Sequence, residues 1–534
     1  METDVLIIGS GAAGMYAAIA AARSGARVLI VDRSLIGRGG ATVMAQMTVA
    51  VALGEEAPDH WQHHLADTLK AGRGLCEPAL SQLLCEDAPE CIREMDDWGV
   101  GWARADGHIR QVQAPGHDRA RCVYVDFVNT GPAVSKTLRA QLQRTPAIQR
   151  TGDLLVTDLV VENGVCIGAH AVHVSTGRAV PIAAKATIIA TGGLTRLYAR
   201  NSASLNMGGD GYALALRAGA ELCDMEFVQF FPIGHLAPRM VGMDPIMWDP
   251  FRYKLGGRLL NGRMEEFLAE DGKYTSVRDR ATHAILKEVA AGRGTPHGGV
   301  WLSFRHCSDA ELRGAFGPVI ERLAANGIDL TSDLIEVAPI AHYHMGGIRV
   351  DAEMRTGVPH LFAAGEAVGG ANGANRLSGN AITEAFTFGR RAGLRAAALA
   401  KAARMPSWKS SSSGSGKAPD INAAAEIVKL QRIMNEHVGP LRAPTGLTWA
   451  LDHISRLAEA CEALPAPRGG LDPQWIDLHD LRNMRLVAEC VTRAALGRTE
   501  SRGAHQREDF PQAGDAWQRH QRIRLSPEGL RIEG

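Results

Sequence analysis

Short apolar runs separated by glycines open the chain and predict a buried sheet. Residues 4–8 (DVLII) and 28–31 (VLIV) are continuous apolar runs of strand length, which is typical of strands buried on both faces. Between them, the alanine-rich residues 15–24 predict a helix, and Gly25 fits its C-terminal cap. A further buried strand is predicted at 186–190. The pattern therefore predicts a strand–helix–strand unit with a parallel sheet.

The pattern changes twice in the middle of the chain. Residues 153–182 form short β-like runs, and an Asn-Gly pair at 163–164 predicts a hairpin turn. Residues 231–340 are more charged and more helical, with amphipathic spacing at 309–326, which favours an inserted second domain. Glycine turns and short strands return from residue 342, so the first domain is predicted to be discontinuous in sequence.

The remaining segments are predicted to be mostly helical. Residues 55–150 are typical of helices joined by long loops. Residues 405–419 (MPSWKSSSSGSGKAP) have the composition of a flexible linker. Beyond it, residues 422–438 and 478–496 are helical, and the second of these helices carries an apolar stripe that is more typical of a core than of a cofactor site.

Composition narrows the range of partners and compartments. The 534 residues are 46% hydrophobic and 22% charged, with 58 basic and 58 acidic side chains. This balance argues against nucleic acid or an acidic membrane surface as the main partner. The longest apolar runs, about ten residues, are too short to cross a bilayer. Because the first strand follows Met1 almost at once, we expect a soluble, cytoplasmic protein without a signal peptide.

The nine cysteines show no pair spaced as CxxC and no spacing typical of an iron–sulfur cluster. One-electron chemistry would therefore need a second protein. His60, His63 and His64 have helical spacing and could touch one metal ion, but no acidic or cysteine ligand accompanies them in a recognisable spacing. We therefore interpret them as a solvated or locally packed helix face and predict no metal site.

A glycine motif between the first strand and the first helix indicates a dinucleotide. Residues 9–14 read G-x-G-x-x-G, and Asp32 closes the next strand. In this setting the missing side chains let the backbone approach a pyrophosphate, which the helix N-terminus stabilises, and the acid accepts hydrogen bonds from a ribose. The alternative interpretation is a tight turn in a sheet that binds no nucleotide.

Further motifs follow in a specific order along most of the chain. They are residues 9–14, Gly39-Gly-Ala-Thr-Val-Met-Ala-Gln46, Ala190-Thr-Gly-Gly193, Gly208-Gly-Asp-Gly-Tyr-Ala213, Ala341-His-Tyr-His-Met-Gly-Gly347, Leu361-Phe-Ala-Ala-Gly-Glu366, Gly373-Ala-Asn-Arg376 and Glu500-Ser-Arg-Gly-Ala-His505. With these motifs the chain resembles the flavoprotein subunits of succinate dehydrogenase and fumarate reductase, with L-aspartate oxidase and adenylylsulfate reductase as relatives.

The resemblance implies an α/β fold of three parts. These are a doubly wound, Rossmann-like FAD-binding domain, an inserted α+β capping domain and a C-terminal helical domain. The expected boundaries are an FAD-binding domain at 1–230 and 342–404, a capping domain at 231–341, a linker at 405–419 and a helical domain at 420–534.

The resemblance also implies which residues contact FAD. Carried over by position, they are Gly9, Ser10, Gly11, Ala12, Ala13, Gly14, Asp32, Arg33, Gly39, Gly40, Ala41, Thr42, Gln46, Asp210, Glu366, Asn380, Ala381 and Ile382. The helix that starts at Asn380 could stabilise negative charge on the reduced flavin with its positive end. Several family members attach FAD to a histidine at the position of Ala41, which has no nucleophilic atom, so we expect non-covalent FAD.

The substrate residues depart further from the family. Its dicarboxylate enzymes carry a His-Pro-Thr-Gly run where this chain has Phe231-Pro-Ile-Gly234. Their proton-transferring arginine falls on Tyr253 in strict register, and Arg252 or Lys254 could serve after a shift of one residue. His342 and Arg376, which bind a substrate carboxylate in the family, are both present, although His342 could instead be a core histidine.

These residues predict an FAD-dependent oxidoreductase that transfers hydride between flavin N5 and a carbon–carbon bond of an organic acid other than fumarate or succinate. Electrons would be exchanged with an iron–sulfur or other electron-transfer protein. The alternatives are an oxidase or a sulfur-compound reductase on the same fold, or a non-catalytic flavin protein that only carries electrons.

Overall fold

The computed structural model describes residues 1–126, 128–238, 247–268, 278–407, 420–461 and 464–534. Most of the predicted linker at 405–419 lies outside these described residues. The chain divides into two compact units. Unit 1 contains residues 1–199, 203–228 and 343–534, and unit 2 contains residues 200–202 and 229–342.

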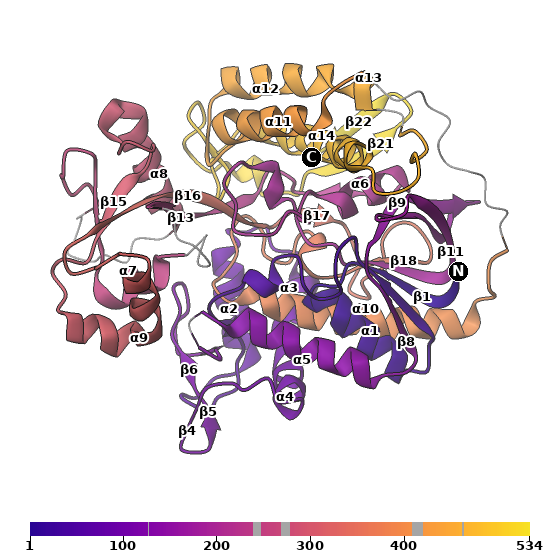
Figure 1. The fold of residues 1–534 in the computed structure, drawn as a ribbon, viewed down its shortest axis with the longest axis horizontal. Helices are drawn as coiled ribbons and strands as arrows, with labels where there is room; N and C mark the ends of the chain where they lie inside the picture. The colour runs from indigo at the N-terminus through magenta and orange to yellow at the C-terminus, as the bar shows by residue number, and fades with distance from the viewer. Residues whose placement is uncertain (127, 239–246, 269–277, 408–419, 462–463) are drawn as a thin grey trace. The chain divides into compact units, whose positions relative to one another are not determined.

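The main sheet of unit 1 has the strand order β8-β2-β1-β11-β10-β9, and β18 pairs with β11 (Figure 1). Pairing is parallel from β8 through β11 and between β11 and β18, and antiparallel among β9, β10 and β11. The strands are β1 (Glu2–Ile8), β2 (Val28–Val31), β8 (Ile148–Thr151), β9 (Leu154–Glu162), β10 (Val165–His173), β11 (Arg178–Ile189) and β18 (Leu361–Ala363).

The predicted elements of this sheet form, with two shifts in their boundaries. The helix predicted at 15–24 is α1 (Ala12–Arg23), because the small residues after Gly11 already complete its first turn. The strand predicted at 186–190 begins at Arg178, because its antiparallel pairing with β10 lengthens it. The predicted hairpin turn joins β9 to β10, with Asn163 and Gly164 both at positive φ (50° and 77°).

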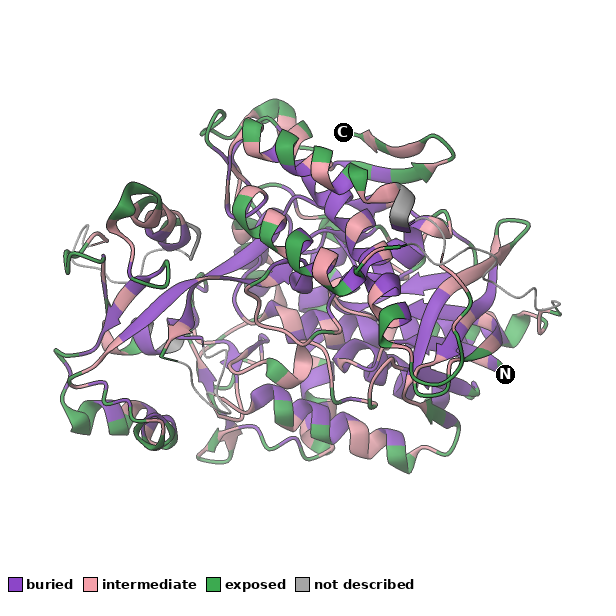
Figure 2. Cartoon of the chain, turned by 45° about the horizontal axis from the view of Figure 1, so that its top comes forward, coloured by how far each residue is buried: buried purple, intermediate pink, exposed green. Residues whose placement is uncertain are grey.

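Helices cover both faces of the sheet. α1 lies beside α10 (Asn380–Ala402), and their backbones approach so closely that a Cβ on Gly389 would be 2.5 Å from the carbonyl oxygen of Ala13. On the opposite face, Leu214 of α6 (Asp210–Arg217) packs with the core side chains of β1 and β2. Figure 2 shows this buried centre beneath helices whose outer faces are exposed.

The other elements of unit 1 surround this centre. Its remaining strands are β3 (Val49–Ala50), β4 (Arg104–Ala105), β5 (His108–Ile109), β6 (Gln111–Val112), β7 (Cys122–Val123), β12 (Leu222–Cys223), β17 (Gly347–Ile348), β19 (Leu441–Arg442), β20 (Gln506–Arg507), β21 (Arg522–Ser526) and β22 (Gly529–Glu533). Its remaining helices are α2 (Trp61–Ala71), α3 (Pro78–Glu86), α4 (Ala88–Asp97), α5 (Thr130–Arg144), α6 (Asp210–Arg217), α11 (Ala423–His437), α12 (Pro444–Arg456), α13 (Ala458–Cys461) and α14 (Pro473–Gly497).

The three clustered histidines do not form one site. His60 caps α2 with an extended backbone instead of lying within the helix, and it is exposed, as is His63. His64 is fully buried, and its Nε2 lies 2.8 Å from Oδ1 of Asn380. These positions agree with a helix face that is partly solvated and partly packed.

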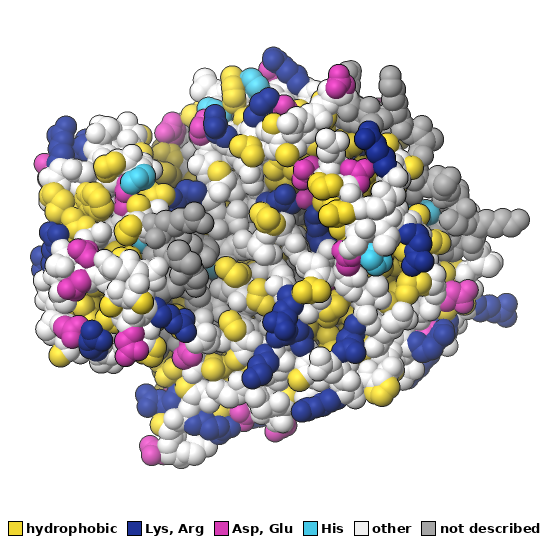
Figure 3. All heavy atoms as spheres, viewed as in Figure 1, with side chains coloured by type: hydrophobic (Ala, Val, Ile, Leu, Met, Phe, Trp, Pro, Cys, Tyr) yellow, Lys and Arg dark blue, Asp and Glu magenta, His cyan; other side chains and the backbone are white. Residues whose placement is uncertain are grey.

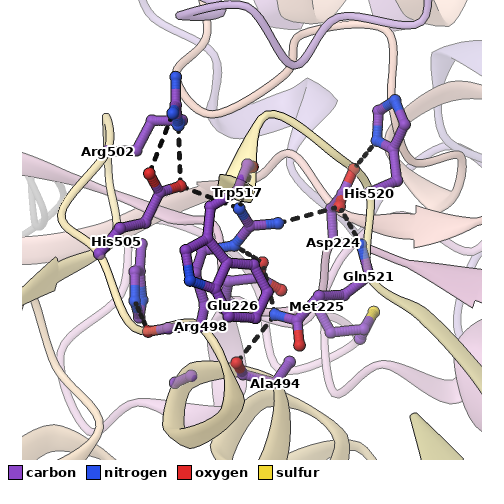
Figure 4. A network of polar contacts seen from close by, with 12 residues as sticks. Asp224, Met225, Glu226, Ala494, Arg498, Arg502, His505, Trp517, His520 and Gln521 are labelled. Atoms are coloured by element: carbon purple, nitrogen blue, oxygen red, sulfur yellow. Dashed lines mark hydrogen bonds and ion pairs between the residues drawn. The ribbon is translucent and has the colours of Figure 1, made fainter. Parts of the chain in front are cut away.

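A buried ionic network fastens the C-terminal segment to the rest of unit 1 (Figure 4). Arg498 donates to the carboxylate of Glu226 and, at 2.9 Å, to that of Glu500. The guanidinium carbon also lies 5.0 Å from the centroid of the Phe227 ring and 5.1 Å from that of the Trp517 ring. Because a buried charge is costly without partners, removing one member of this network should destabilise the fold strongly.

Unit 2 is an α+β unit built on the sheet β13-β16-β15-β14. Its elements are β13 (Val228–Ala237), α7 (Asp249–Leu255), β14 (Arg258–Leu260), α8 (Arg278–Glu288), β15 (Val300–Ser303), α9 (Asp309–Ala325) and β16 (Leu334–His344). Ser308 and Glu311 form a capping box at the start of α9. Phe251 of α7 stacks on Phe316 of α9, with ring centroids 4.1 Å apart.

Basic and acidic side chains both occur across the face shown in Figure 3, in keeping with a formal net charge of zero. Among the described residues, no helix combines the length and the apolar character that crossing a membrane requires.

Candidate functional site

The glycine motif between β1 and α1 contains glycines of two kinds. A Cβ on Gly9, whose φ is +103°, would be 2.4 Å from the carbonyl oxygen of Ala190. A Cβ on Gly14 would be 2.0 Å from the carbonyl oxygen of Gly9. Gly11 has an ordinary φ of −67°, and the nearest described atom to its Cβ would be Oγ1 of Thr42 at 3.6 Å. The fold requires Gly9 and Gly14, whereas the space at Gly11 is left open for a ligand.

The N-terminus of α1 is suited to an anion. Its first turn consists of Ala12, Ala13 and Gly14, so it carries no side-chain carboxylate of its own. The amide of Ala12 donates to Oγ1 of Thr42 at 3.0 Å. The first amides of a helix lack intrahelical acceptors and carry partial positive charge, which favours a phosphate at this end.

Asp32 organises the turn next to this helix. Its Oδ2 accepts hydrogen bonds from the amide and hydroxyl of Ser10 at 3.0 and 2.6 Å. Its Oδ1 accepts from the amide and hydroxyl of Ser34, both at 2.9 Å. A carboxylate offers about four acceptor positions, so a ribose hydroxyl at Asp32, as predicted, would share oxygens that already hold the two serines.

Arg33 and Asp210, both predicted to contact FAD, lie in an ion-pair network with α14. The Arg33 guanidinium is 2.7 Å from Asp480 and 3.3 Å from Asp210. Burial opposes its charge, but the two carboxylates raise the pKa of Arg33 above its usual value. Asp210, His479 and Asp480 could together hold a metal ion by geometry alone. Because Arg33 also neutralises the two acids, we interpret the group as an ion-pair network.

The predicted flavin loop at 39–46 is held from two sides. The Gly40 amide donates to the hydroxyl of Ser204 at 2.7 Å. From α5, Gly131 packs under the loop so closely that a Cβ there would be 2.0 Å from the carbonyl oxygen of Thr42. Ala41 and Gln46 are half-buried in this loop. The alanine offers no atom for a covalent flavin bond.

At the N-terminus of α10, the side chain of the first residue, Asn380, is bound within the protein, so the backbone amides are what the helix offers to a ligand. Asn380 is fully buried, and its amide group contacts His64, Thr68 and Asn372 at 2.8, 3.2 and 3.3 Å. Its side chain is thus engaged within the protein. The first turn contains Ala381 and Ile382 and carries no acid, which leaves the positive end of the helix for a negatively charged group.

Two carboxyl groups in unit 1 have strongly raised pKa values. Oε1 of Glu366 accepts from the amide of His344 at 3.1 Å and lies close to Gly193, where a Cβ would be 2.3 Å away. Oε2 of Glu384 accepts from the hydroxyl of Tyr343 and, at 2.7 Å, from Asn372. Burial raises the pKa of Glu366 to about 8 and that of Glu384 to about 7, although Arg376 lowers both in part.

Arg376 is held by this group of residues. Its side chain is buried, and its guanidinium carbon lies 4.3 Å from the centroid of the Tyr343 ring. Tyr343 in turn donates its hydroxyl to Glu384, so the ring under the guanidinium is fixed at its far end. An arginine oriented in this way can bind a carboxylate with two parallel hydrogen bonds.

His342 lies in unit 2 and is half-buried. Its Nδ1 is 2.7 Å from the hydroxyl oxygen of Ser202. The ring of Phe231 stands at 88° to the imidazole, with 4.1 Å between the ring centroids. Phe231 and Ile233 are 2% and 0% exposed. Phe231, which replaces the family's histidine, therefore packs against His342, and Ile233, which replaces its threonine, is buried two residues further along β13.

The three residues considered for proton transfer lie on α7 in unit 2. Arg252 is 1% exposed. Lys254 is exposed, donates to the carbonyl oxygen of Ala315 at 3.3 Å and lies 4.9 Å from the centroid of the Phe316 ring. Tyr253 belongs to the same helix. Arg252 is thus buried and Lys254 exposed, a difference that the sequence alone does not reveal.

Three further residues near the predicted substrate residues were not predicted from the sequence: Ser202 contacts His342, Tyr343 lies against Arg376, and Glu384 accepts a hydrogen bond from Tyr343. Tyr343 lies inside one of the sequence motifs, and Glu384 is an acid one turn into the helix that starts at Asn380, so the sequence held a signal for both. Ser202 lies 140 residues from His342 in the chain, and nothing in the local sequence connects the two.

Comparisons with known proteins show the family to which the chain belongs. Residues 4–382 match the family described as FAD binding domain, and residues 428–533 match the family described as fumarate reductase flavoprotein C-term. The chain is 35% identical to a fumarate reductase (CoM/CoB) subunit of Methanothermobacter marburgensis, covering 97% of this chain and 96% of that protein. It is 33% identical to L-aspartate oxidase of Streptomyces coelicolor, with 99% and 92% covered.

Among solved structures, Sdh1 of Mycobacterium smegmatis in complex with UQ1 matches with a TM-score of 0.90 and 33% identity, covering 100% of this chain and 94% of that one. The predicted fold class and the FAD cofactor are confirmed by these matches. The open space at Gly11 and the two helix N-termini fit such a dinucleotide. The chain therefore belongs to the flavoprotein family of fumarate reductase and succinate dehydrogenase, and it is an FAD-dependent oxidoreductase.

Proposed function

We propose that this oxidoreductase acts on a carbon–carbon bond of an organic acid with a single free carboxylate, other than fumarate or succinate. The observation that carries the proposal is the apolar packing beside His342. Phe231 packs against the imidazole, and Ile233, two residues after Phe231 in the chain, is also buried. A second carboxylate placed against such apolar groups would lose hydration without gaining a hydrogen bond, at a cost of several kcal/mol.

In this proposal the chain's own residues bind and orient the acid. Arg376, held by Tyr343, would bind the carboxylate through two hydrogen bonds, and His342 would add a donor. Bound FAD would supply hydride transfer at its N5 atom. The FAD contacts that the sequence predicts, of which Gly9 is the first and Ile382 the last, are part of the same proposal.

We assign proton transfer to the guanidinium of Arg252 rather than to Lys254. Arg252 is screened from water, whereas Lys254 is exposed and its ammonium group contacts α9. A group that moves a proton to or from a substrate must be within hydrogen-bond reach of it in a site that excludes bulk water. Tyr253, which strict register would select, stays an alternative for the same role.

Electrons are proposed to pass to or from a second redox protein. Relatives of the chain are described as one subunit of a fumarate reductase and as a quinol fumarate reductase. Each described cysteine is a free thiol, and the sequence holds no spacing for a cluster. We expect activity with artificial dyes or a partner protein, and none with NADH alone.

An oxidase is the second candidate, favoured by the 33% identity to L-aspartate oxidase over nearly the whole chain. An oxidase would form hydrogen peroxide with L-aspartate in air and need no partner. A sulfur-compound reductase or a purely electron-carrying flavoprotein would not respond to the acids tested below.

The test is a series of three substrates that share one double bond. Monomethyl fumarate has one free carboxylate, fumarate has two, and dimethyl fumarate has none. We expect the dithionite-reduced enzyme to be reoxidised fastest by monomethyl fumarate, measured anaerobically by stopped-flow absorbance of the flavin. Equal or faster reaction with fumarate would contradict the proposal, and reaction with dimethyl fumarate would exclude a carboxylate-binding role for Arg376.

A further inference from the structure

The tripeptide 200–202 is positioned by unit 2, although its neighbours on both sides in the chain belong to unit 1. Asn201 forms a parallel bridge with Ala341. The amide of Ala341 donates to the carbonyl oxygen of Arg200, and the amide of Ser202 donates to that of Ala341, both at 3.0 Å. These bonds fix the backbone of Ser202 beside the residue that precedes His342.

The side chain of Arg200 strengthens this attachment. Its Nη2 donates to the carbonyl oxygens of Gly234 and His235 on β13, at 3.5 and 3.1 Å. The tripeptide is therefore bound both to β16 and to β13. With its backbone held in this way, Ser202 places its hydroxyl oxygen 2.7 Å from Nδ1 of His342.

We propose that Ser202 is a positioning residue for His342: its hydroxyl donates to Nδ1 and thereby keeps the proton of the neutral imidazole on Nε2, which then donates to the substrate carboxylate. The hydrogen bond at one ring nitrogen decides which nitrogen carries the proton. The perpendicular ring of Phe231 limits rotation of the imidazole from a second direction. This inference rests on the proposed function, because that function requires a donor at His342.

The first test needs no substrate. Nitrogen-15 spectra of the FAD-loaded protein, labelled in its 19 histidines, would be compared with those of His342→Gln to identify the His342 signals. We expect Nδ1 to resonate as an unprotonated nitrogen and Nε2 as a protonated one. In Ser202→Ala the two shifts should move toward each other, whereas Ser202→Thr, which keeps a hydroxyl, should resemble the wild type. A protonated Nδ1 in the wild type would overturn the proposal, even if the Ser202 variants failed to fold.

The second test measures steady-state kinetics with monomethyl fumarate. Losing one hydrogen bond of ordinary strength should raise KM roughly 2- to 12-fold in Ser202→Ala. The kcat and the FAD content should stay near wild type, and Ser202→Thr should restore KM. A loss of FAD or of kcat at unchanged KM would show a merely structural role and overturn the inference. If the wild type does not react with monomethyl fumarate, the proposed substrate class is wrong, while the spectra still decide the role of Ser202.

Discussion

The glycine turn of unit 1 is shaped by backbone atoms, whereas the environment of His342 in unit 2 is shaped by side chains. Around Gly9 and Gly14, backbone atoms approach to distances that exclude any side chain, so the predicted cofactor site would be formed by the main chain itself. Around His342, by contrast, side chains from separate segments of unit 2 set the environment. A backbone site restricts the sequence and keeps its cofactor, whereas a side-chain site can change its substrate by substitution.

The sharpest test of this difference is at Gly11. Gly11→Val should lose nearly all bound FAD while the polypeptide stays folded, because the nearest described atom to its Cβ, Oγ1 of Thr42 at 3.6 Å, is at ordinary contact distance, whereas the pyrophosphate would meet the new side chain. Gly14→Val is the matched variant, and it should fail to fold because its Cβ would meet the carbonyl oxygen of Gly9. The flavin-to-protein absorbance ratio and circular dichroism measure the two effects. Full FAD content in Gly11→Val would show that the dinucleotide does not approach this residue.

The wild-type protein should release its FAD on acid or heat precipitation. Ala41 stands where several family members attach the flavin to a histidine, and alanine has no nucleophilic atom. Yellow colour that remains with the washed precipitate would disprove non-covalent binding and indicate attachment to another residue.

In unit 2, substitution of the buried Arg252 should lower kcat far more than substitution of the exposed Lys254. Removing a proton-transfer group typically costs about 10²- to 10⁴-fold in rate, so Arg252→Gln should lower kcat with monomethyl fumarate by that order. Lys254→Gln should change kcat little, because its ammonium group contacts the backbone of α9. The opposite ranking of the two variants would move proton transfer to Lys254.

In unit 1, Arg376 should govern substrate affinity. Arg376→Lys should raise KM by about 10- to 100-fold, because an ammonium cannot reproduce a two-pronged, charge-assisted contact. Tyr343→Phe keeps the ring beneath the guanidinium and removes only the hydroxyl that binds Glu384, so its effect on KM should be smaller. An unchanged KM in Arg376→Lys would mean that the carboxylate binds elsewhere.

The smallest expected effect concerns the pH dependence of stability. Glu384 has a folded-state pKa of about 7, above the value of 4.5 expected for an unfolded chain. Between these two pH values the folded protein binds more protons than the unfolded one, so its free energy of unfolding falls as pH rises. Glu384→Gln should make this decline shallower, by at most about 1.4 kcal/mol per pH unit. Thermal melts from pH 5 to 7 measure it, and parallel curves for both proteins would contradict the raised pKa.

The sequence predicts the cofactor half of the molecule better than the substrate half. The strands around Gly9, the helix after it and the hairpin at Asn163 follow from local periodicity and turn chemistry, which depend on neighbours in the chain. The contact of Arg33 with Asp480 joins residues 447 positions apart in the chain, and the contact of Ser202 with His342 joins residues 140 positions apart. No local pattern encodes such contacts, because tertiary packing decides them.

The most direct test of the proposed substrate class compares fumarate with monomethyl fumarate as oxidants of the reduced, FAD-loaded enzyme. We predict that masking one carboxylate increases the rate of flavin reoxidation, because the side chains of Phe231 and Ile233 are apolar and cannot donate a hydrogen bond to a second carboxylate. Reoxidation by fumarate at rates ordinary for enzymes, about 1 to 1,000 per second, and faster than by its monomethyl ester would contradict this prediction.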